Sequence, residues 1–168
     1  MKIDDILEEE TLPLIDSKKH SSVPFPQANS VECILQILLN TEEEGSTLCS
    51  YIVRNIVNSE RQASYYVNAA IYLGLCKKIG NFYYLTGNGL RVRNSSESRQ
   101  RNVLASIMLS HSVIGRWYSQ VFLYDSVKER FSFLQAGFER SLSIATIERR
   151  CMCVLTWMSW IQKNLPVI

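Results

Sequence analysis

The chain has 168 residues, 46% of them hydrophobic and 20% charged, which is enough apolar content for one domain or two small ones. Charged residues interrupt its apolar runs well before membrane-spanning length, and the acidic N-terminus lacks the layout of a signal peptide, so we expect a cytoplasmic protein without a membrane segment. The five cysteines include Cys151 and Cys153 with no histidine nearby, which argues against a zinc site and fits a reducing compartment.

The net charge of +2 hides a strong asymmetry along the chain. Residues 1–53 hold 3 basic and 10 acidic side chains, residues 54–101 hold 8 and 2, and residues 102–168 hold 7 and 4. A basic block that follows an acidic one is typical of a protein with one face for nucleic acid. Ordinary scatter of charges also produces such blocks and is the alternative.

Residues 1–29 are predicted to form an N-terminal arm and linker. Residues 3–15 have the apolar spacing of a short amphipathic helix. The polar segment 16–29 contains two prolines, which favours an extended path, and we expect Phe25 to anchor it on a core.

Three helices follow the arm. The first is expected over residues 30–40 with Ser30 as its N-cap, and the second begins after Ser46 or Thr47 and places Leu48, Ile52 and Ile56 at four-residue spacing. The third is expected over residues 60–73, and Gly74 is placed to end it.

A β-hairpin is predicted directly after the third helix. Residues 75–79 and 82–85 are short apolar and aromatic runs, and Gly80–Asn81 between them suits a two-residue type II′ turn. Three helices followed by a hairpin is the element order of a winged helix-turn-helix.

The third helix sorts its side chains onto two faces. A period of 3.6 residues places Ala63, Tyr66, Val67, Ala70 and Leu73 on one face, which is the expected core side. The other face carries groups that can contact bases and phosphates in the major groove, although a solvated helix face has a similar composition. The predicted DNA contacts of this helix are Arg61, Gln62, Ser64, Tyr65, Asn68 and Tyr72. The hairpin adds Lys77 and Lys78 as phosphate contacts, and Arg91 and Arg93 extend the basic track.

The second half of the chain is predicted to be helical, without an obvious wing. Residues 94–101 are either a hinge or the polar start of a helix. Helices are expected from residue 103 with a break at residues 110–112, over residues 125–138, and over residues 145–163. Near the start of the last helix, Thr146, Arg149 and Arg150 are candidates for DNA backbone contacts; an ion pair with Glu139 or Glu148 is the alternative for the arginines. The predicted fold is therefore mainly α with a small β-hairpin, in two tandem winged-helix-like modules over residues 30–93 and 94–168.

Two motifs add a resemblance to a known family. The run Glu60-Arg61-Gln62-Ala63-Ser64-Tyr65-Tyr66 is followed by Ala69-Ala70, Leu73-Gly74-Leu75 and Leu85-Thr86-Gly87-Asn88-Gly89. This run resembles the winged-helix DNA-recognition module of type II restriction endonucleases and related restriction-modification proteins. A looser second motif contains Thr146, Arg149, Arg150 and Ser159-Trp160, with Cys153 where a second threonine is usual and Trp157 where a small or polar residue is more common. The resemblance covers residues 30–165 and implies a recognition module that is coupled to a nuclease or methyltransferase.

No active site is predicted. Asp16-Ser17-Lys18 matches the short metal-binding pattern of restriction nucleases, but no preceding strand supplies the second acid, and His20 and His111 have no triad or metal cluster around them. We therefore expect no catalytic residue, metal or cofactor.

Three functional hypotheses remain open at the level of sequence. The first is sequence-specific recognition of double-stranded DNA, as a domain or subunit of a restriction-modification system. The second is an adaptor that docks onto a nuclease or forms a homodimer, with Tyr65, Tyr72 and Trp160 as anchors. A transcriptional regulator is the third.

Overall fold

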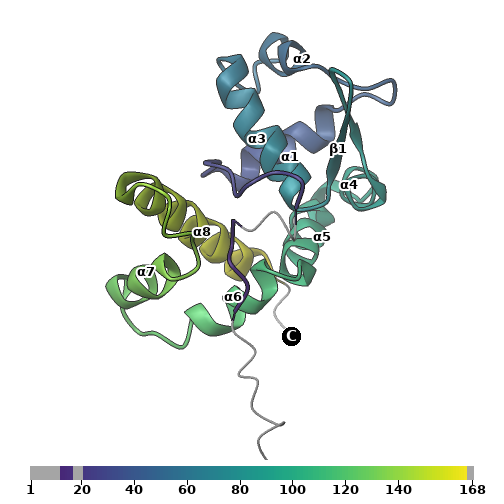
Figure 1. Cartoon of the computed structure of the whole chain (residues 1–168). Helices are drawn as coiled ribbons and strands as arrows, with labels where there is room; N and C mark the ends of the chain where they lie inside the picture. Colours follow the sequence, from purple (N-terminus) through teal and green to yellow (C-terminus); the bar gives the residue numbers. More distant parts are fainter. Residues whose placement is uncertain (1–11, 17–20, 166–168) are drawn as a thin grey trace, which may run out of the picture.

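The computed structural model describes residues 12–16 and 21–165, which form helices and a single two-stranded antiparallel sheet (Figure 1). The prediction of a mainly helical chain with one hairpin is confirmed. Within the described ranges, no helix combines the length and the apolar character that a membrane crossing requires. The expected helix over residues 3–15 lies largely outside the described residues.

The first three helices lie close to their predicted positions. Helix α1 covers Val31–Asn40, and the Ser30 hydroxyl accepts a hydrogen bond from the backbone N–H of Cys33. Helix α2 covers Leu48–Val53 after Thr47, and helix α3 covers Glu60–Tyr72. Helix α2 is shorter than predicted and excludes Ile56, because Asn55 adopts a left-handed conformation with φ of 58° that ends the helix.

A Schellman motif ends α3. The backbone N–H of Leu75 donates to the carbonyl of Ala70, and that of Gly74 donates to the carbonyl of Ile71. Gly74 has φ of 71°, a conformation that glycine adopts without a steric penalty. The predicted helix stop is thereby confirmed, and it turns the chain directly into the hairpin.

The hairpin consists of strands β1 (Cys76–Ile79) and β2 (Phe82–Leu85). Cys76 pairs with Leu85 at the base and Ile79 pairs with Phe82 beside the turn. Gly80 has φ of 59°, which agrees with the predicted type II′ turn. An antiparallel bridge between Ser46 and Tyr83 adds the segment before α2 to the other side of β2.

Five further helices follow within the described residues: α4 (Gly87–Arg93), α5 (Glu97–Ser110), α6 (Ile114–Val121), α7 (Val127–Gln135) and α8 (Ile144–Asn164). The break before α6 and the long last helix were predicted. Helix α5 begins at Glu97, so of the two alternatives for residues 94–101 the polar helix start is correct. Helix α4 begins after Thr86, whose hydroxyl accepts from the backbone N–H of Gly89. The part of residues 94–168 that the structure describes contains helices and no strand.

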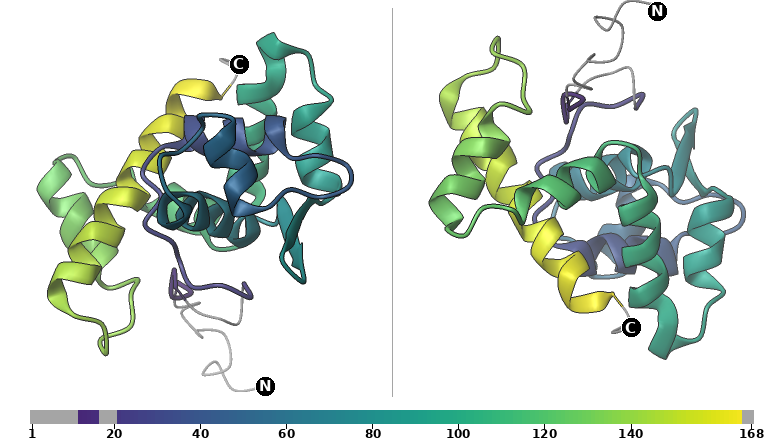
Figure 2. Two further views of the ribbon diagram at one scale, coloured as in Figure 1. Left: turned by 90° about the horizontal axis from the view of Figure 1, so that it is seen from above. Right: turned by 90° about the horizontal axis from the view of Figure 1, so that it is seen from below.

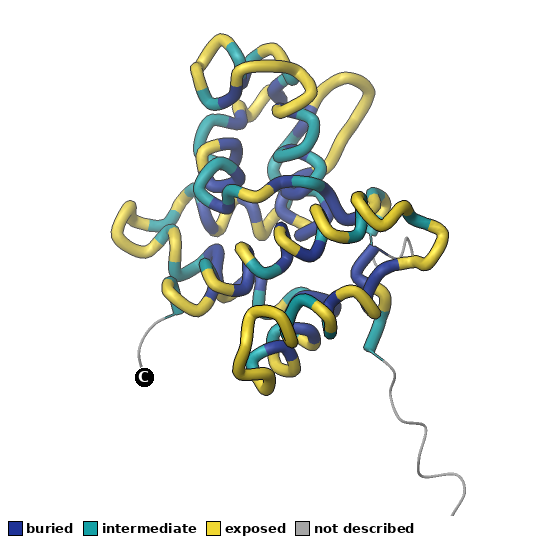
Figure 3. The backbone as a smooth tube through the Cα atoms, turned by 90° about the vertical axis from the view of Figure 1, so that its left-hand side faces the viewer, coloured by how far each residue is buried: buried dark blue, intermediate teal, exposed yellow. Residues whose placement is uncertain are grey.

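One hydrophobic core contains side chains from both predicted modules. Ile34 of α1, Leu104 of α5 and Trp157 of α8 are all fully buried in it. The second half of α8 passes the start of α1 in both views of Figure 2, and Figure 3 shows the buried positions on the inward-facing turns. A smaller core between α1, α2 and α3 contains Tyr51 and Tyr83.

The N-terminal strap, defined as the described residues 12–16 and 21–29, is part of this core. Ile15, Phe25 and Ala28 are buried, so the predicted anchoring of Phe25 is confirmed. The strap also provides backbone acceptors, because the indole N–H of Trp117 donates to the carbonyl of Pro13, and that of Trp157 donates to the carbonyl of Ala28. These residues therefore hold α6 and α8 in place, which a linker alone would not do.

Candidate nucleic-acid interface

Helix α2, the start of α3 and the hairpin tip lie at one end of the fold, and α6 and α7 lie at the other (Figure 1). The pairing of Ser46 with Tyr83 carries the chain from the base of the hairpin toward its tip, so Thr47, the N-cap of α2, follows near the tip. The thiol of Cys49 donates to the carboxylate of Glu60 at 3.0 Å, which joins α2 to the first residue of α3. We call this region the α3–hairpin end.

The exposed face of α3 carries most of the predicted contacts. Arg61 and Gln62 are exposed, whereas Ser64, Tyr65 and Asn68 are partly exposed. Arg61 Nε donates to the Tyr65 hydroxyl at 2.8 Å, and its guanidinium lies over the Tyr65 ring. The Asn68 amide donates one N–H to the Ser64 hydroxyl at 3.4 Å. Four donors of the guanidinium and the second N–H of the Asn68 amide remain on this helix face, a set that can bond to base edges or phosphates.

Tyr72 does not belong to this face, contrary to the prediction. Its side chain is 2% exposed and its hydroxyl donates to the carbonyl of Ile15 at 2.5 Å. The ring of His111 stacks on it, with centroids 5.0 Å apart. Tyr72 lies in the same helical stripe as Tyr65, but the strap, the end of α5 and Trp157 of α8 cover it. Burial accordingly raises the pKa of its phenol, which remains a neutral donor.

The two hairpin lysines lie on opposite faces of the sheet. Side chains of paired residues share a face, so Lys78 lies with Tyr83, while Lys77 lies with Tyr84. Lys78 Nζ is 5.7 Å from the centre of the Tyr83 ring, on the side that packs against α1, α2 and α3. Lys77 instead lines a hollow together with Glu42 and Glu43. Only Lys78 is therefore on the same side of the hairpin as α3.

The folded chain brings part of the basic block, residues 54–101, next to the acidic block, residues 1–53. Three arginines of the basic block form ion pairs with the acidic block: Arg54 with Glu42, Arg93 with Glu43 and Arg101 with Glu32. Arg93 also donates to the carbonyl of Thr41, so it does not extend a free basic track as predicted. The other five cations of this basic block, Arg61, Lys77, Lys78, Arg91 and Arg99, have no described acid within ion-pair distance.

The candidate residues at the start of α8 are separate from the α3–hairpin end. The backbone N–H of Thr146 donates to the Ser143 hydroxyl, and the two hydroxyls lie 2.8 Å apart, so this threonine takes part in the helix cap. Arg150 forms an ion pair with Asp16 at 3.1 Å, and its side chain is 13% exposed. A phosphate contact by Arg150 is therefore wrong as a prediction, and its partner is neither Glu139 nor Glu148.

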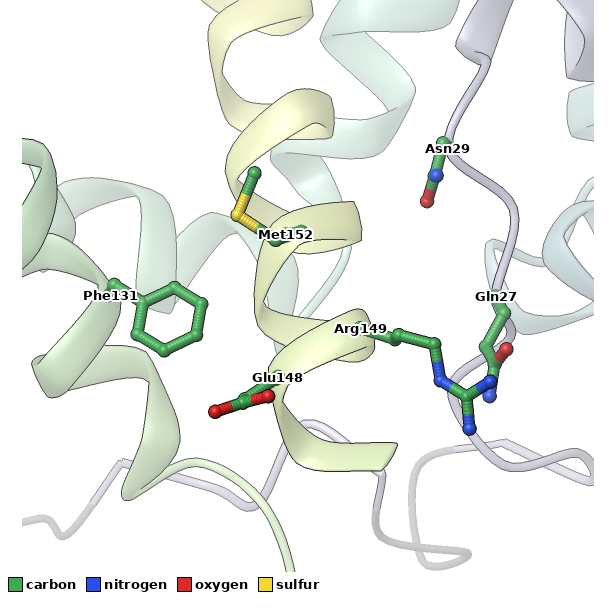
Figure 4. A pocket seen from close by; sticks show the side chains of 6 residues that line it. All are labelled: Gln27, Asn29, Phe131, Glu148, Arg149 and Met152. Carbon is green, nitrogen blue, oxygen red and sulfur yellow. The ribbon is translucent and has the colours of Figure 1, made fainter. Parts of the chain in front are cut away.

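Arg149 is accessible, but it lies in a hollow between α8 and the strap and not beside α3. It lines an open hollow of about 460 Å³ with Gln27 and Asn29 of the strap and with Phe131, Glu148 and Met152. Figure 4 shows its side chain extended toward Gln27, with Phe131 and Glu148 on the other side of α8. No α3 residue lines this hollow as far as the chain is described.

Two exposed apolar residues at the hairpin tip were not predicted as functional. Ile79 is 57% exposed and Phe82 is 45% exposed, directly on either side of the turn. Their position was available from the sequence, since in a two-residue hairpin the flanking residues share a face. Cys76 and Tyr83 lie on the opposite face of the hairpin and are buried, so the face of Ile79 and Phe82 points toward solvent.

The described residues offer little for catalysis. No three of their His, Cys, Asp or Glu side chains lie together in a way that could hold a metal ion. Burial raises the pKa of Cys33 to about 11 and that of Cys153 to about 12, which keeps these thiols protonated and unreactive. Asp16, the acid of the short nuclease-like pattern, is paired with Arg150, and Ser17 and Lys18 lie outside the described residues.

The described residues form a mainly helical chain with a lysine-bearing hairpin and one helix, α3, whose exposed face is polar. The family model of a domain of unknown function, DUF7226, matches residues 32–165, and the chain belongs to this family. No curated protein and no solved structure matches the chain.

Proposed function

We propose that the chain binds double-stranded DNA through a winged helix-turn-helix, with α3 in the major groove and the β1–β2 hairpin against the flanking backbone. The order of α1, Ser46, α2, α3, β1 and β2 supports this assignment, because a winged helix has a short strand before its second helix that joins the wing sheet.

The observation that carries the proposal is the meeting of three features at the α3–hairpin end. The exposed start of α3 presents Arg61 and Gln62, Lys78 lies on the same side of the hairpin as α3, and α2 links the two. Neither Arg61 nor Lys78 pairs with a described acid, so both cations are available to phosphates or to guanine.

A role as the recognition part of a restriction-modification system extends this proposal. It rests on the motif resemblance around Arg61 and Tyr65, and a nuclease or methyltransferase would then be the partner. The structure weakens the adaptor hypothesis, in which Tyr65, Tyr72 and Trp160 contact a partner. Tyr72 is buried, and the indole N–H of Trp160 donates to Glu32 of the same chain.

The proposal is tested with duplexes that the full chain selects from a random-sequence pool. Affinity is measured by fluorescence anisotropy for the wild type and for the double variant Arg61→Ala and Asn68→Ala. Each lost base contact should cost about 1–3 kcal/mol. Lys128→Ala is the matched control, since Lys128 is an exposed cation on α7 at the far end of the fold.

Two results would refute the proposal. One is the recovery of no duplex above background from the random pool. The other is unchanged affinity of the double variant at low salt, where the wild type and Lys128→Ala bind equally well. Loss of affinity that is equal on selected and unrelated duplexes would instead assign Arg61 and Asn68 to the phosphate backbone.

A further inference from the structure

The tip of the hairpin is narrow, open and apolar. A side-chain carbon added at Gly80 would meet no other atom within 4 Å, so nothing in the fold covers the turn. Ile79 and Phe82 pair across the strands beside the turn and point to the same outer face. An exposed phenylalanine and isoleucine at the outermost point of a strand pair contribute nothing to the core.

The surroundings of this tip favour a polyanion. The hairpin segment from Cys76 to Leu85 contains Lys77 and Lys78 and no acidic residue. The acidic loop of Glu42, Glu43 and Glu44 lies toward the base, because Ser46 pairs with Tyr83 and the chain runs from base to tip from there. Toward the base of the same face, Lys77 lies beside Glu42 and Glu43, whose carboxylates are paired with Arg54 and Arg93. Lys78 is on the opposite face of the hairpin. The apolar pair therefore extends beyond carboxylates that already have counter-charges.

The size of the apolar pair argues against a protein partner. A stable protein interface buries about 800 Å² on each side, with several large side chains at its centre. Two side chains on a two-residue turn form a wedge instead of a surface. Apolar wedges of Phe, Ile or Leu that enter the minor groove partly unstack a base step and kink the duplex.

We propose that Ile79 and Phe82 form a wedge that inserts between base pairs in the groove next to the one that α3 occupies, and that bound DNA is bent there. This inference rests on the proposed function, and it adds that the hairpin deforms DNA as well as contacting its phosphates. Lys78 would hold the backbone on the α3 side while the wedge enters from the tip. Sequence preference at that step would follow the ease of unstacking, with TA and CA steps favoured.

The test uses the full chain and the duplexes that it selects from a random-sequence pool. End-to-end energy transfer between dyes on a selected duplex reports bending, and 2-aminopurine placed at successive steps reports unstacking. The variants are Phe82→Ala, Phe82→Lys and the control Leu123→Ala, which removes a more exposed apolar side chain (73% against 45% for Phe82) from the loop after α6. Thermal melts by circular dichroism establish that each variant is folded.

Wild type and Leu123→Ala should bend the duplex and brighten 2-aminopurine at one step. Phe82→Ala should abolish both signals and weaken binding roughly tenfold, as expected for a lost base–aromatic contact. Phe82→Lys should retain or increase affinity through its added charge and still fail to bend the duplex. That variant separates the wedge from general electrostatic attraction.

Two outcomes would overturn the inference. If the wild type binds duplex DNA without any change in energy transfer or 2-aminopurine fluorescence, the wedge is refuted and the proposed function stands. The same holds if Phe82→Ala bends DNA as the wild type does. If the wild type selects and binds no duplex, the proposed function fails and the wedge fails with it.

Discussion

Arg150 Nη1 lies 3.1 Å from Asp16 Oδ2, and this ion pair joins the last helix to the N-terminal strap. The carboxylate also accepts a hydrogen bond from the backbone N–H of Glu139, so one buried acid connects three segments of the chain. Burial raises the pKa of Asp16 in spite of the nearby guanidinium, which indicates that desolvation outweighs the charge attraction.

We expect Asp16→Asn to destabilise the protein by about 3 kcal/mol, because it leaves the Arg150 charge buried without a counter-charge. Urea unfolding followed by tryptophan fluorescence measures the effect. The double variant Asp16→Asn and Arg150→Met should recover part of the loss, and the exposed Asp125→Asn should have no effect. An unfolding midpoint for Asp16→Asn equal to that of the wild type would show that the pair contributes nothing.

Tyr72→Phe tests whether this tyrosine belongs to the core and not to the proposed DNA-contacting face of α3. The variant removes the hydroxyl that satisfies the Ile15 carbonyl and should cost about 1–3 kcal/mol in unfolding free energy. Its affinity for a selected duplex should equal that of the wild type at a temperature where both are folded. A loss of affinity without a loss of stability would return Tyr72 to the interface.

The two hairpin lysines should differ in their effect on DNA binding. Lys78→Ala should weaken binding and reduce the slope of log affinity against log salt by about 0.9, the value for one phosphate contact. Lys77→Ala should have a smaller effect, because Lys77 lies beside Glu42 and Glu43. Anisotropy titrations at several salt concentrations compare the two variants, and equal slopes would contradict the assignment of separate faces.

The Glu32–Arg101 pair should make stability depend on pH in the acid range. Hydrogen bonds from Arg101, and then from Trp160, lower the pKa of Glu32 below its ordinary value of 4.5. A carboxyl with a lowered pKa in the folded state stabilises fully above its unfolded pKa, and this contribution is lost as pH falls through the folded pKa. Wild type should therefore exceed Glu32→Gln in melting temperature at pH 7.

The two melting curves should converge as the pH falls below 4.5. Both side chains are nearly half exposed, at 44% and 48%, so the difference at pH 7 should stay below about 1 kcal/mol. A constant difference down to pH 2 would mean that the ionised carboxyl is not its source.

Gly45→Ala should destabilise the bridge between Ser46 and the hairpin. Gly45 has φ of 92°, and an added Cβ would lie 2.7 Å from the ring of Tyr84. Both the strained backbone and the contact oppose the substitution, and a loss of at least about 1 kcal/mol is expected in urea unfolding. Gly87→Ala is the control, because it meets no atom within 4 Å and should be neutral or slightly stabilising.

The local elements could be predicted because their signals are local. Gly74 and the turn at Gly80 fix the end of α3 and the hairpin through backbone conformation, and the 3.6-residue period identifies the buried side of α3. The charges of Arg61 and Lys78 were likewise visible in the sequence. These features give the outline of the α3–hairpin end.

The remaining features depend on contacts between distant parts of the chain. Tyr72 is buried by Ile15 and His111, which are 57 and 39 residues away, and helical periodicity contains no information about them. Arg150 is 134 residues from its partner Asp16, so its loss as a phosphate contact could not be seen in the sequence. The acid partners of Arg54, Arg93 and Arg101 were hidden for the same reason.

The N-terminal strap limits how this protein can diverge. Its backbone carbonyls at Pro13, Ile15 and Ala28 accept from Trp117, Tyr72 and Trp157, so three buried donors in separate helices depend on one short stretch of main chain. In a chimera that takes residues 30–93 from a relative, Tyr72 would come from one protein and the strap from another. Such a chimera would keep a native core only if the relative's residue at position 72 can still bond to this strap. Substitutions at Arg61, Gln62 or Lys78 are exempt from this constraint, because the exposed end can vary while the framework behind it stays the same.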